Sequence, residues 1–249
     1  MEVHAHSHTA RKKWTHYFWE FLMLFLAVFC GFLAENFREH QVEHQREKKY
    51  AASLLEDLKK DTADLAHDIP FWTLYISRVD TAQMEIRNPV ALRNHLLLYR
   101  CVAYMRRYDN FAYHDRTIEQ LKSGGNFRLI RNKLISDSLI DYDAIIRSEL
   151  HDQEMQSNAI WQSLNFLQDR IFDAELYNLS RQETKLDSAV KINPQKIEAR
   201  KGQEDLLFEY SNRLNYFRAI NTFRKNNNEI ILRKAINLME MLKKEYHLK

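Results

Sequence analysis

Glycine, proline and cysteine are all scarce in this chain. Its 249 residues include 4 Gly, 3 Pro and 2 Cys. All-β and α/β folds need many tight turns, for which glycine and proline are the usual residues, so their scarcity argues against both classes. A disulfide between Cys30 and Cys101 would join an apolar run to an amphipathic one, and we expect both thiols to be free. The composition favours an all-α chain with a few long helices and short connections.

A concentration of charge of one sign is also lacking. The 37 basic and 34 acidic residues are interspersed and give a net charge of +3. Proteins that bind nucleic acids usually gather basic residues on one face or in one tail, so we expect no nucleic-acid partner. Apolar residues make up 45% and charged residues 29% of the chain, which excludes a disordered chain and a membrane protein of many spans.

One long apolar run is present near the N-terminus. Residues 21–34 (FLMLFLAVFCGFLA) carry no charge, and counting back to Trp14 gives the roughly 20 residues that cross a bilayer. Trp14, Tyr17 and Trp19 would form an aromatic belt at the interface. We therefore predict a transmembrane helix over residues 14–35, with the lipid bilayer as its surroundings.

Three other interpretations of this run stay open. A cleaved signal peptide also has basic residues before an apolar stretch, but no A-x-A cleavage site follows it. A lipoprotein would use Cys30, but the bulky Phe29 stands before it where a small residue is expected. A buried core helix is the third interpretation, and the aromatic and basic flanks favour the bilayer over it.

Basic residues around the span indicate its orientation. Residues 11–13 (RKK) lie close to the apolar run, whereas Arg38, Arg46 and residues 48–49 lie farther away on the other side. Basic residues favour the cytoplasmic side of a membrane, and long domains cross regardless of their charge. We therefore expect a cytoplasmic N-terminus and a helical domain on the outer side.

Within the span, four residues form a predicted intramembrane contact. Glu20 is the one acidic residue within the span. An acidic side chain inside a membrane is energetically unfavourable and often has a function. It would snorkel to the interface or face a partner helix; the sharper hypothesis is a proton-carrying carboxylate packed against another membrane protein. Ala27, Gly31 and Ala34 have small side chains that permit close approach of a second copy or of another membrane protein.

Behind the span, the sequence predicts a polar stalk and a helical domain. Residues 36–50 contain no Gly or Pro and little apolar surface, so we expect a solvated helix. Apolar residues then recur at helical spacing through residues 51–249, which is consistent with an antiparallel bundle of about six or seven helices. Pro70 predicts a break or the first turn of a new helix, and residues 151–158 predict a bend or a long exposed turn. A last helix is predicted after Asn226–Asn228.

A loop and a short helix are predicted near the middle of the chain. Residues 108–115 break the apolar pattern, and Asp115 is placed to cap a helix over residues 116–122. Gly124 and Gly125 follow its basic last turn and would end it. A phosphate site at these glycines is the alternative interpretation, but the Walker spacing is missing.

No arrangement typical of a metal, cofactor or catalytic site stands out. Residues 4–8 (HAHSH), in a flexible tail over residues 1–13, impose no geometry on a metal ion. His40 and His44 share a helix face, but the zinc motif H-E-x-x-H needs a glutamate where Gln41 stands. We therefore predict a non-enzymatic protein with no catalytic residue, no metal and no cofactor.

One aromatic and basic segment is a candidate ligand cleft, although core packing at a bundle end is the more usual role of such residues. The predicted cleft consists of Tyr99, Arg100, Tyr104, Arg107, Tyr108 and Tyr113.

Two segments of the chain are distinctive: HYFWEFLMLFLAVFCGFLAENFREHQVEHQREKKYAASLLEDLKKD (residues 16–61) and IEQLKSGGNFRLIRN (residues 118–132). They resemble parts of an uncharacterised family of single-pass, N-terminally anchored helical membrane proteins of Bacteroidetes. The resemblance implies a membrane anchor, a helical stalk and a helical domain, and it implies no activity, substrate or site residue. With the predicted orientation, the protein would sit in a bacterial inner membrane with its helical domain in the periplasm.

Two functional hypotheses follow from these patterns. The first is a membrane-anchored scaffold or accessory protein that acts through protein–protein contacts, with a membrane protein or a second copy as its partner. The alternative is an extracytoplasmic ligand-sensing bundle. With only about a dozen residues before the anchor, it would have to signal through a partner protein.

Overall fold

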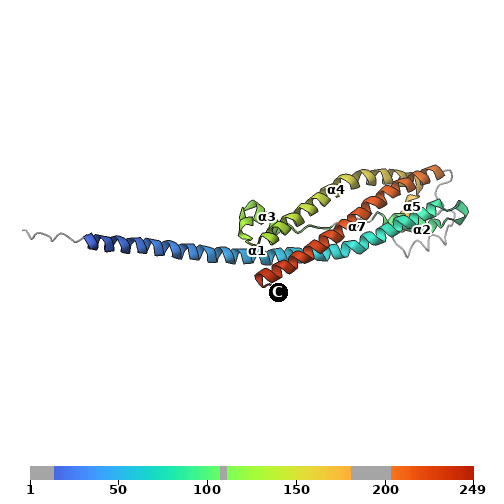
Figure 1. The fold of residues 1–249 in the computed structure, drawn as a ribbon. Coiled ribbons are helices and arrows are strands. Elements are labelled where there is room, and N and C mark those ends of the chain that lie inside the picture. The colour runs from blue at the N-terminus through green and yellow to red at the C-terminus, as the bar shows by residue number, and fades with distance from the viewer. Residues whose placement is uncertain (1–13, 107–110, 181–202) are drawn as a thin grey trace, which may run out of the picture. The chain divides into compact units, whose positions relative to one another are not determined.

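Every regular element that the structure describes is a helix. This computed structural model describes residues 14–106, 111–180 and 203–249, with only the backbone at residues 153–158 and 180. The helices are α1 (Trp14–Arg87), α2 (His95–Tyr104), α3 (Arg116–Ser123), α4 (Lys133–Ile171), α5 (Ala174–Ser180) and α7 (Glu204–Tyr246), with the short 3-10 helices η1 (Val90–Leu92) and η2 (Asn126–Leu129) (Figure 1). The predicted all-α class is confirmed.

The chain divides into two compact units, Met1–Tyr50 and Ala51–Lys249, and α1 contributes residues to both. In the first unit, α1 contains an apolar stretch long enough to cross a membrane. None of the 18 most apolar residues of this stretch is buried. A soluble domain would bury such a surface, so this segment has the properties of a membrane span.

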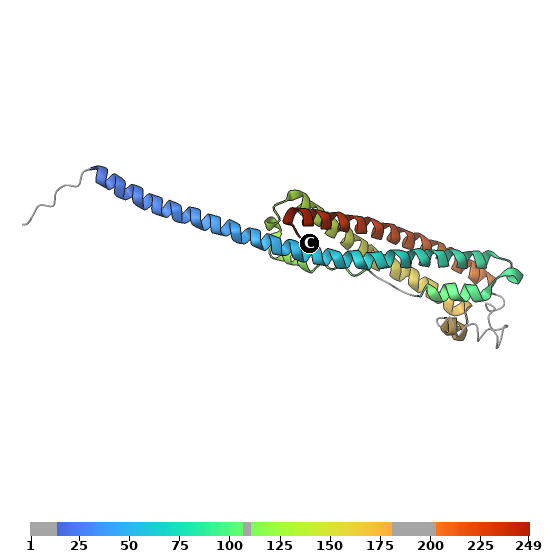
Figure 2. The ribbon, with the colours of Figure 1, turned by 90° about the horizontal axis from the view of Figure 1, so that it is seen from below.

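Three long helical segments make up most of the second unit, and cross-helix contacts give their directions. The contacting pairs are Thr62–Met239 and Gln83–Ser211 between α1 and α7, and Asn132–Glu245 and Gln168–Tyr210 between α4 and α7. In both sets residue numbers rise on one helix and fall on the other. α7 is therefore antiparallel to α1 and to α4, and Figures 1 and 2 show α4 and α7 side by side.

One apolar core joins α1, α2, α4, α5 and α7. The α1 side chains in it recur every three or four positions and so share one helix face: Trp72, Tyr75, Val79, Ala82 and Ile86. Aromatic rings meet across helices, with 5.5 Å between the ring centres of Tyr75 and Phe217 and 5.2 Å between those of Tyr99 and Phe172. Each buried aromatic side chain removes about 150–250 Å² from water, so these contacts dominate the packing.

The interruptions predicted at Pro70 and at Asn226–Asn228, and the exposed turn predicted at residues 151–158, are wrong. α1 continues through Pro70, α4 through residues 151–158 and α7 through Asn226–Asn228. A proline inside a helix removes a hydrogen bond and costs about 3 kcal/mol. Leu65 and Trp72, on either side of Pro70, are both buried, and their packing contacts offset that cost.

The asparagines of α7 do not end the helix because one of them has a partner on α4. The side-chain amide of Asn227 donates a hydrogen bond to the carboxylate of Glu149. Asparagine disfavours helices mainly because its side chain competes for nearby backbone groups. A bond to another helix removes that competition.

The predicted helix over residues 116–122 is confirmed as α3, but its predicted cap is wrong. Asp115 occupies the N-cap position, yet its side chain makes no hydrogen bond to the first amides of the helix. The predicted stop is confirmed, because Gly125 follows the helix with φ 61°, a left-handed conformation that glycine adopts at no steric cost.

Candidate functional site

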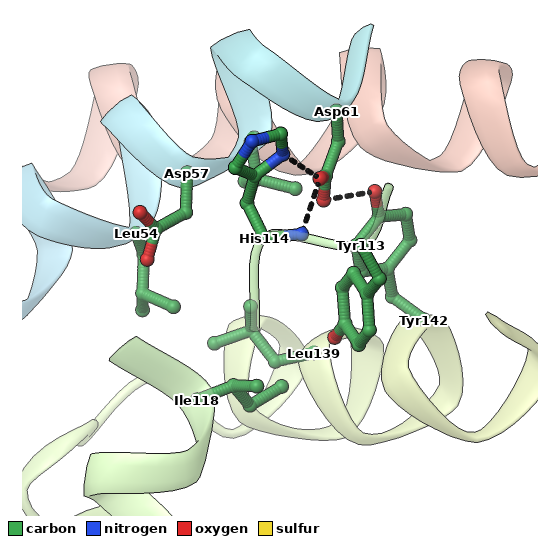
Figure 3. A pocket seen from close by; sticks show the side chains of 9 residues that line it. Leu54, Asp57, Asp61, Tyr113, His114, Ile118, Leu139 and Tyr142 are labelled. Atoms are coloured by element: carbon green, nitrogen blue, oxygen red, sulfur yellow. Dashed lines mark hydrogen bonds and ion pairs between the residues drawn. The ribbon is translucent and has the colours of Figure 1, made fainter. Parts of the chain in front are cut away.

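Three buried aspartates connect α1, α3, α4 and the segment that precedes α3. Asp57 and Asp61 lie on α1 and Asp143 lies on α4, and all three are almost fully buried. A buried carboxylate without partners would be very unfavourable, so each requires donors. We call these groups the aspartate cluster: Asp57, Asp61 and Asp143 with Tyr113, His114, Thr117, Lys122, Tyr142 and Arg147. Figure 3 shows five of them: Asp57, Asp61, Tyr113, His114 and Tyr142.

Asp61 joins α1 to α4 and to the segment before α3. Its Oδ1 accepts the backbone N–H of His114 at 2.9 Å and lies 3.0 Å from Nδ1 of the His114 ring. Its Oδ2 accepts the hydroxyl of Tyr142 at 2.8 Å. Figure 3 shows the imidazole and the Tyr142 hydroxyl converging on this one carboxylate. Both oxygens of Asp61 are therefore used to hold two other segments.

Asp57 supplies the cap that Asp115 does not. Its Oδ2 accepts the backbone N–H of Thr117 at 3.1 Å and also binds the Thr117 hydroxyl. Thr117 is the second residue of α3, so this N–H is one of the amides that have no partner within the helix. A carboxylate from α1 thus caps α3 and also complements the positive end of its dipole.

Asp143 anchors the third connection and is surrounded by cations. It accepts the Tyr113 hydroxyl at 3.0 Å and the Arg147 Nε at 3.1 Å, and it binds the ammonium of Lys122. Arg147 also reaches Asp115 at 2.9 Å, which explains why that carboxylate is turned away from the amides of α3. α3 is therefore tied to both α1 and α4 by charged side chains.

The space inside the cluster is too small for a substrate. The pocket drawn in Figure 3 has a volume of about 10 Å³, enough for at most about one water molecule. Apolar side chains of Leu54, Leu58, Ile118 and Leu139 close the rest of its wall. The geometry suits a connection between helices, because each of the three aspartates accepts hydrogen bonds from another segment.

Burial raises the pKa of Asp61 above its ordinary value, and the hydrogen bonds from His114 and Tyr142 oppose this shift. Burial also raises the pKa of the Tyr113 and Tyr142 phenols, helped by the neighbouring carboxylates. Both phenols therefore stay protonated at neutral pH and serve as hydrogen-bond donors.

The raised pKa of Asp61 predicts a pH-dependent stability. The folded chain binds this proton more tightly than the unfolded chain, so the contribution is fully present below the unfolded pKa of about 3.9 and is lost as pH rises through the folded pKa. Asp61→Asn removes this titration. We expect the unfolding free energy of the wild type, relative to Asp61→Asn, to fall as pH rises above about 4, measured by urea unfolding of the full chain in detergent.

The matched control is Asp64→Asn, one turn farther along α1, where the carboxylate is partly exposed. Its difference from the wild type should change little over the same pH range, since water reaches this carboxylate in the folded as well as in the unfolded chain. A pH-independent difference for Asp61→Asn would show that its burial does not control its protonation.

The residues of the predicted ligand cleft fall in two separate places. Tyr99 is buried in the apolar core and accepts the backbone N–H of Asp173 at 2.9 Å. Tyr104 packs against the same core, with the guanidinium of Arg78 5.8 Å from its ring centre, and Arg100 is half-buried on the same helix. Tyr113 belongs to the aspartate cluster. Arg107 and Tyr108 lie outside the described residues.

The predicted intramembrane contact lies on α1 in the first unit. The Glu20 carboxylate is 3.1 Å from Nε2 of His16, one turn earlier on the helix. Ala27, Gly31 and Ala34 are all exposed, and a Cβ added to Gly31 would meet nothing within 4 Å. This face therefore has room for a neighbouring helix, and its role in contact stays a prediction.

Over the described ranges, no group of three or more His, Cys, Asp or Glu side chains is arranged to hold a metal ion. The histidine tract at residues 4–8 lies outside those ranges. Both cysteines are free, with Cys30 exposed and Cys101 buried.

The sequence patterns did not lead us to predict the aspartate cluster, although the sequence contains a signal for it. Along α1 the residues Leu58, Asp61, Leu65, Asp68 and Trp72 follow one another at intervals of three and four, so two acids occupy core positions. Acids at such positions predict buried carboxylates with partners. The partners themselves cannot be found from spacing.

Comparisons with protein-family models, with curated proteins and with solved structures find no match to this chain.

Proposed function

We propose that this chain is a membrane-anchored, non-enzymatic scaffold or accessory protein that acts through protein–protein contacts. The observation that carries the proposal is the apolar N-terminal stretch of α1, none of whose 18 most apolar residues is buried. A stretch of this kind is stable in lipid and not in water. The rest of the chain forms a separate unit with a core of its own.

The closed aspartate cluster supports the non-enzymatic part of this proposal. Its carboxylates are used for fastening helices, and the 10 Å³ pocket leaves no room for a substrate. A ligand sensor receives less support, because Tyr99 and Tyr104 of the proposed cleft are used in core packing. A domain whose aromatic residues pack in its core suits a protein that presents a surface.

We further propose that the second unit is an antiparallel multi-helix bundle, and that a helical stalk over residues 36–50 connects it to the membrane span. The proposed location is a bacterial inner membrane with the bundle in the periplasm. Support comes from the basic residues 11–13 beside the span and from the aromatic residues Trp14, Tyr17 and Trp19 at its start, which are exposed as interfacial residues must be.

The test is the location of each end of the chain. The full chain should sediment with membranes and resist extraction by salt, whereas a variant lacking residues 14–35 should be soluble. A C-terminal reporter that is active only outside the cytoplasm should be active, and one that is active only inside should be silent. Recovery of the full chain in the soluble fraction without detergent would refute the anchor, and a cytoplasmic C-terminus would refute the orientation.

A further inference from the structure

The outward side of α7 carries large apolar side chains in place of the usual polar ones. Phe208, Tyr216, Phe223 and Ile230 are 54%, 68%, 58% and 36% exposed. A surface helix normally turns charged and polar residues to solvent. A row of exposed apolar side chains along about six turns of one helix marks a contact site.

The spacing of this row is that of a coiled coil. Tyr216, Phe223 and Ile230 are seven positions apart, and Ala219 and Asn226 lie between them at intervals of three and four. All five are exposed. Repeats of this kind form the seam between paired helices. We call these five residues the α7 seam.

We propose that a second copy of this chain pairs with the first through the α7 seam, with the two α7 helices side by side in the same direction. The direction rests on the proposed function, because two copies anchored in one bilayer present their domains with the same polarity. In this register each seam residue meets its own equivalent, so Phe223 packs on Phe223 of the second copy.

Charge complementarity beside the seam fits a second copy in this direction. Glu229 and Lys234 flank the seam on opposite sides and are five positions apart. In a parallel pair of helices, residues with this relation come together across the interface, so two Glu229–Lys234 ion pairs form, one on each side. The carboxylate of Glu229 also binds Lys225 of its own helix at 2.9 Å, which does not prevent a second contact.

The area available is suitable for a stable dimer. Tyr216 and Phe223 in the seam and Phe208 beside it are aromatic side chains of about 200 Å² each, exposed by half or more, and together they offer about 350 Å² per copy. Two copies therefore cover about 700 Å² with aromatic surface alone, more than half of the roughly 1,200 Å² of a standard interface. Ile230, Ala219 and the flanking residues supply the remainder. Asn226, a polar residue within the seam, would fix the register of the two helices.

The first measurement is the mass of the full chain in detergent micelles by sedimentation at several concentrations. The wild type should be a dimer at micromolar concentration. Phe223→Glu should raise the dissociation constant at least about tenfold, because it places two like charges at the centre of the seam. Ile140→Glu, at a similarly exposed apolar residue of α4, should leave the dimer intact. A monomeric wild type, or equal masses for wild type and Phe223→Glu, would overturn the proposal.

Disulfide trapping tests the register. In a Cys30→Ala background, Phe223→Cys should form a covalent dimer under mild oxidation, whereas Ile236→Cys, on another face of α7, should not. Trapping at residue 236 and not at residue 223 would overturn the proposal. Membrane sedimentation of the same variants tests the membrane anchor separately from the dimer. A soluble chain that still forms the dimer would refute only the anchor, and a membrane-bound monomer would refute only the dimer.

Discussion

Replacing Asp57 with Ala should destabilise the folded chain by about 3 kcal/mol. The change removes the carboxylate that accepts the Thr117 N–H at 3.1 Å and the Thr117 hydroxyl, and both donors would remain buried without it. The loss should appear first in α3, since this helix has no other side-chain cap. Urea unfolding of the full chain in detergent measures the total effect, and hydrogen exchange of the Thr117 amide measures the local one.

Two variants separate capping from a general loss of charge. Asp57→Asn keeps an acceptor oxygen and should recover more than half of the stability, losing mainly the interaction with the helix dipole, about 1 kcal/mol or less. Asp115→Ala changes the residue at the N-cap position of α3, which makes no capping bond, and should cost about 1 kcal/mol or less. If Asp115→Ala destabilised α3 more than Asp57→Ala, the cap would belong to Asp115.

Replacing Arg93 with Met should cost a similar amount, about 3 kcal/mol. The Arg93 guanidinium is buried at the end of α1, where helix carbonyls lack intrahelical partners. Its Nε donates to the Glu85 carbonyl at 3.1 Å and its Nη2 to the Ile86 carbonyl at 2.9 Å. It also binds both carboxylate oxygens of Glu204 at the start of α7, at 2.9 and 3.0 Å, and this pairing lowers the pKa of Glu204.

Arg93→Lys provides the conservative comparison. A lysine keeps the charge but cannot reach two carbonyls and a carboxylate at once, because its ammonium is a single point and not a planar fork. We expect it to recover less than half of the lost stability. Arg87→Met, at an exposed arginine in the last turn of α1, should change stability by about 0.5 kcal/mol or less. Equal effects at Arg93 and Arg87 would mean that charge near the helix end matters and the hydrogen bonds do not.

The aspartate cluster and Arg93 have the same structural role at two places in the second unit. Each uses a buried charged group to hold the start of another helix against α1, that of α3 in one case and that of α7 in the other. Partners of this kind are costly to bury and unfavourable to break, so they favour a single arrangement of the helices. A single arrangement is what a protein needs if one of its faces is to be recognised by another copy.

Composition and short stretches of sequence were sufficient to predict the features that depend on neighbouring residues. The scarcity of Gly and Pro predicted the all-α class, and the uncharged residues 21–34 predicted the segment of α1 that can cross a membrane. The glycine pair after residue 123 predicted the end of α3, because a left-handed residue there depends only on local sterics. In each case the relevant interaction lies within one or two helical turns.

Tertiary structure decided the features whose partners are far apart in the chain. Asp61 is held by His114 and Tyr142, which are 53 and 81 positions away. Tertiary contacts also decided two other features. At Pro70, the packing of buried neighbours keeps α1 continuous. At α3, the cap comes from Asp57 on α1 and not from the adjacent Asp115. A local pattern predicts that a carboxylate is buried, since buried apolar residues surround it in the sequence. Only the packed helices determine which donor it meets, because that depends on distance in space and not along the chain.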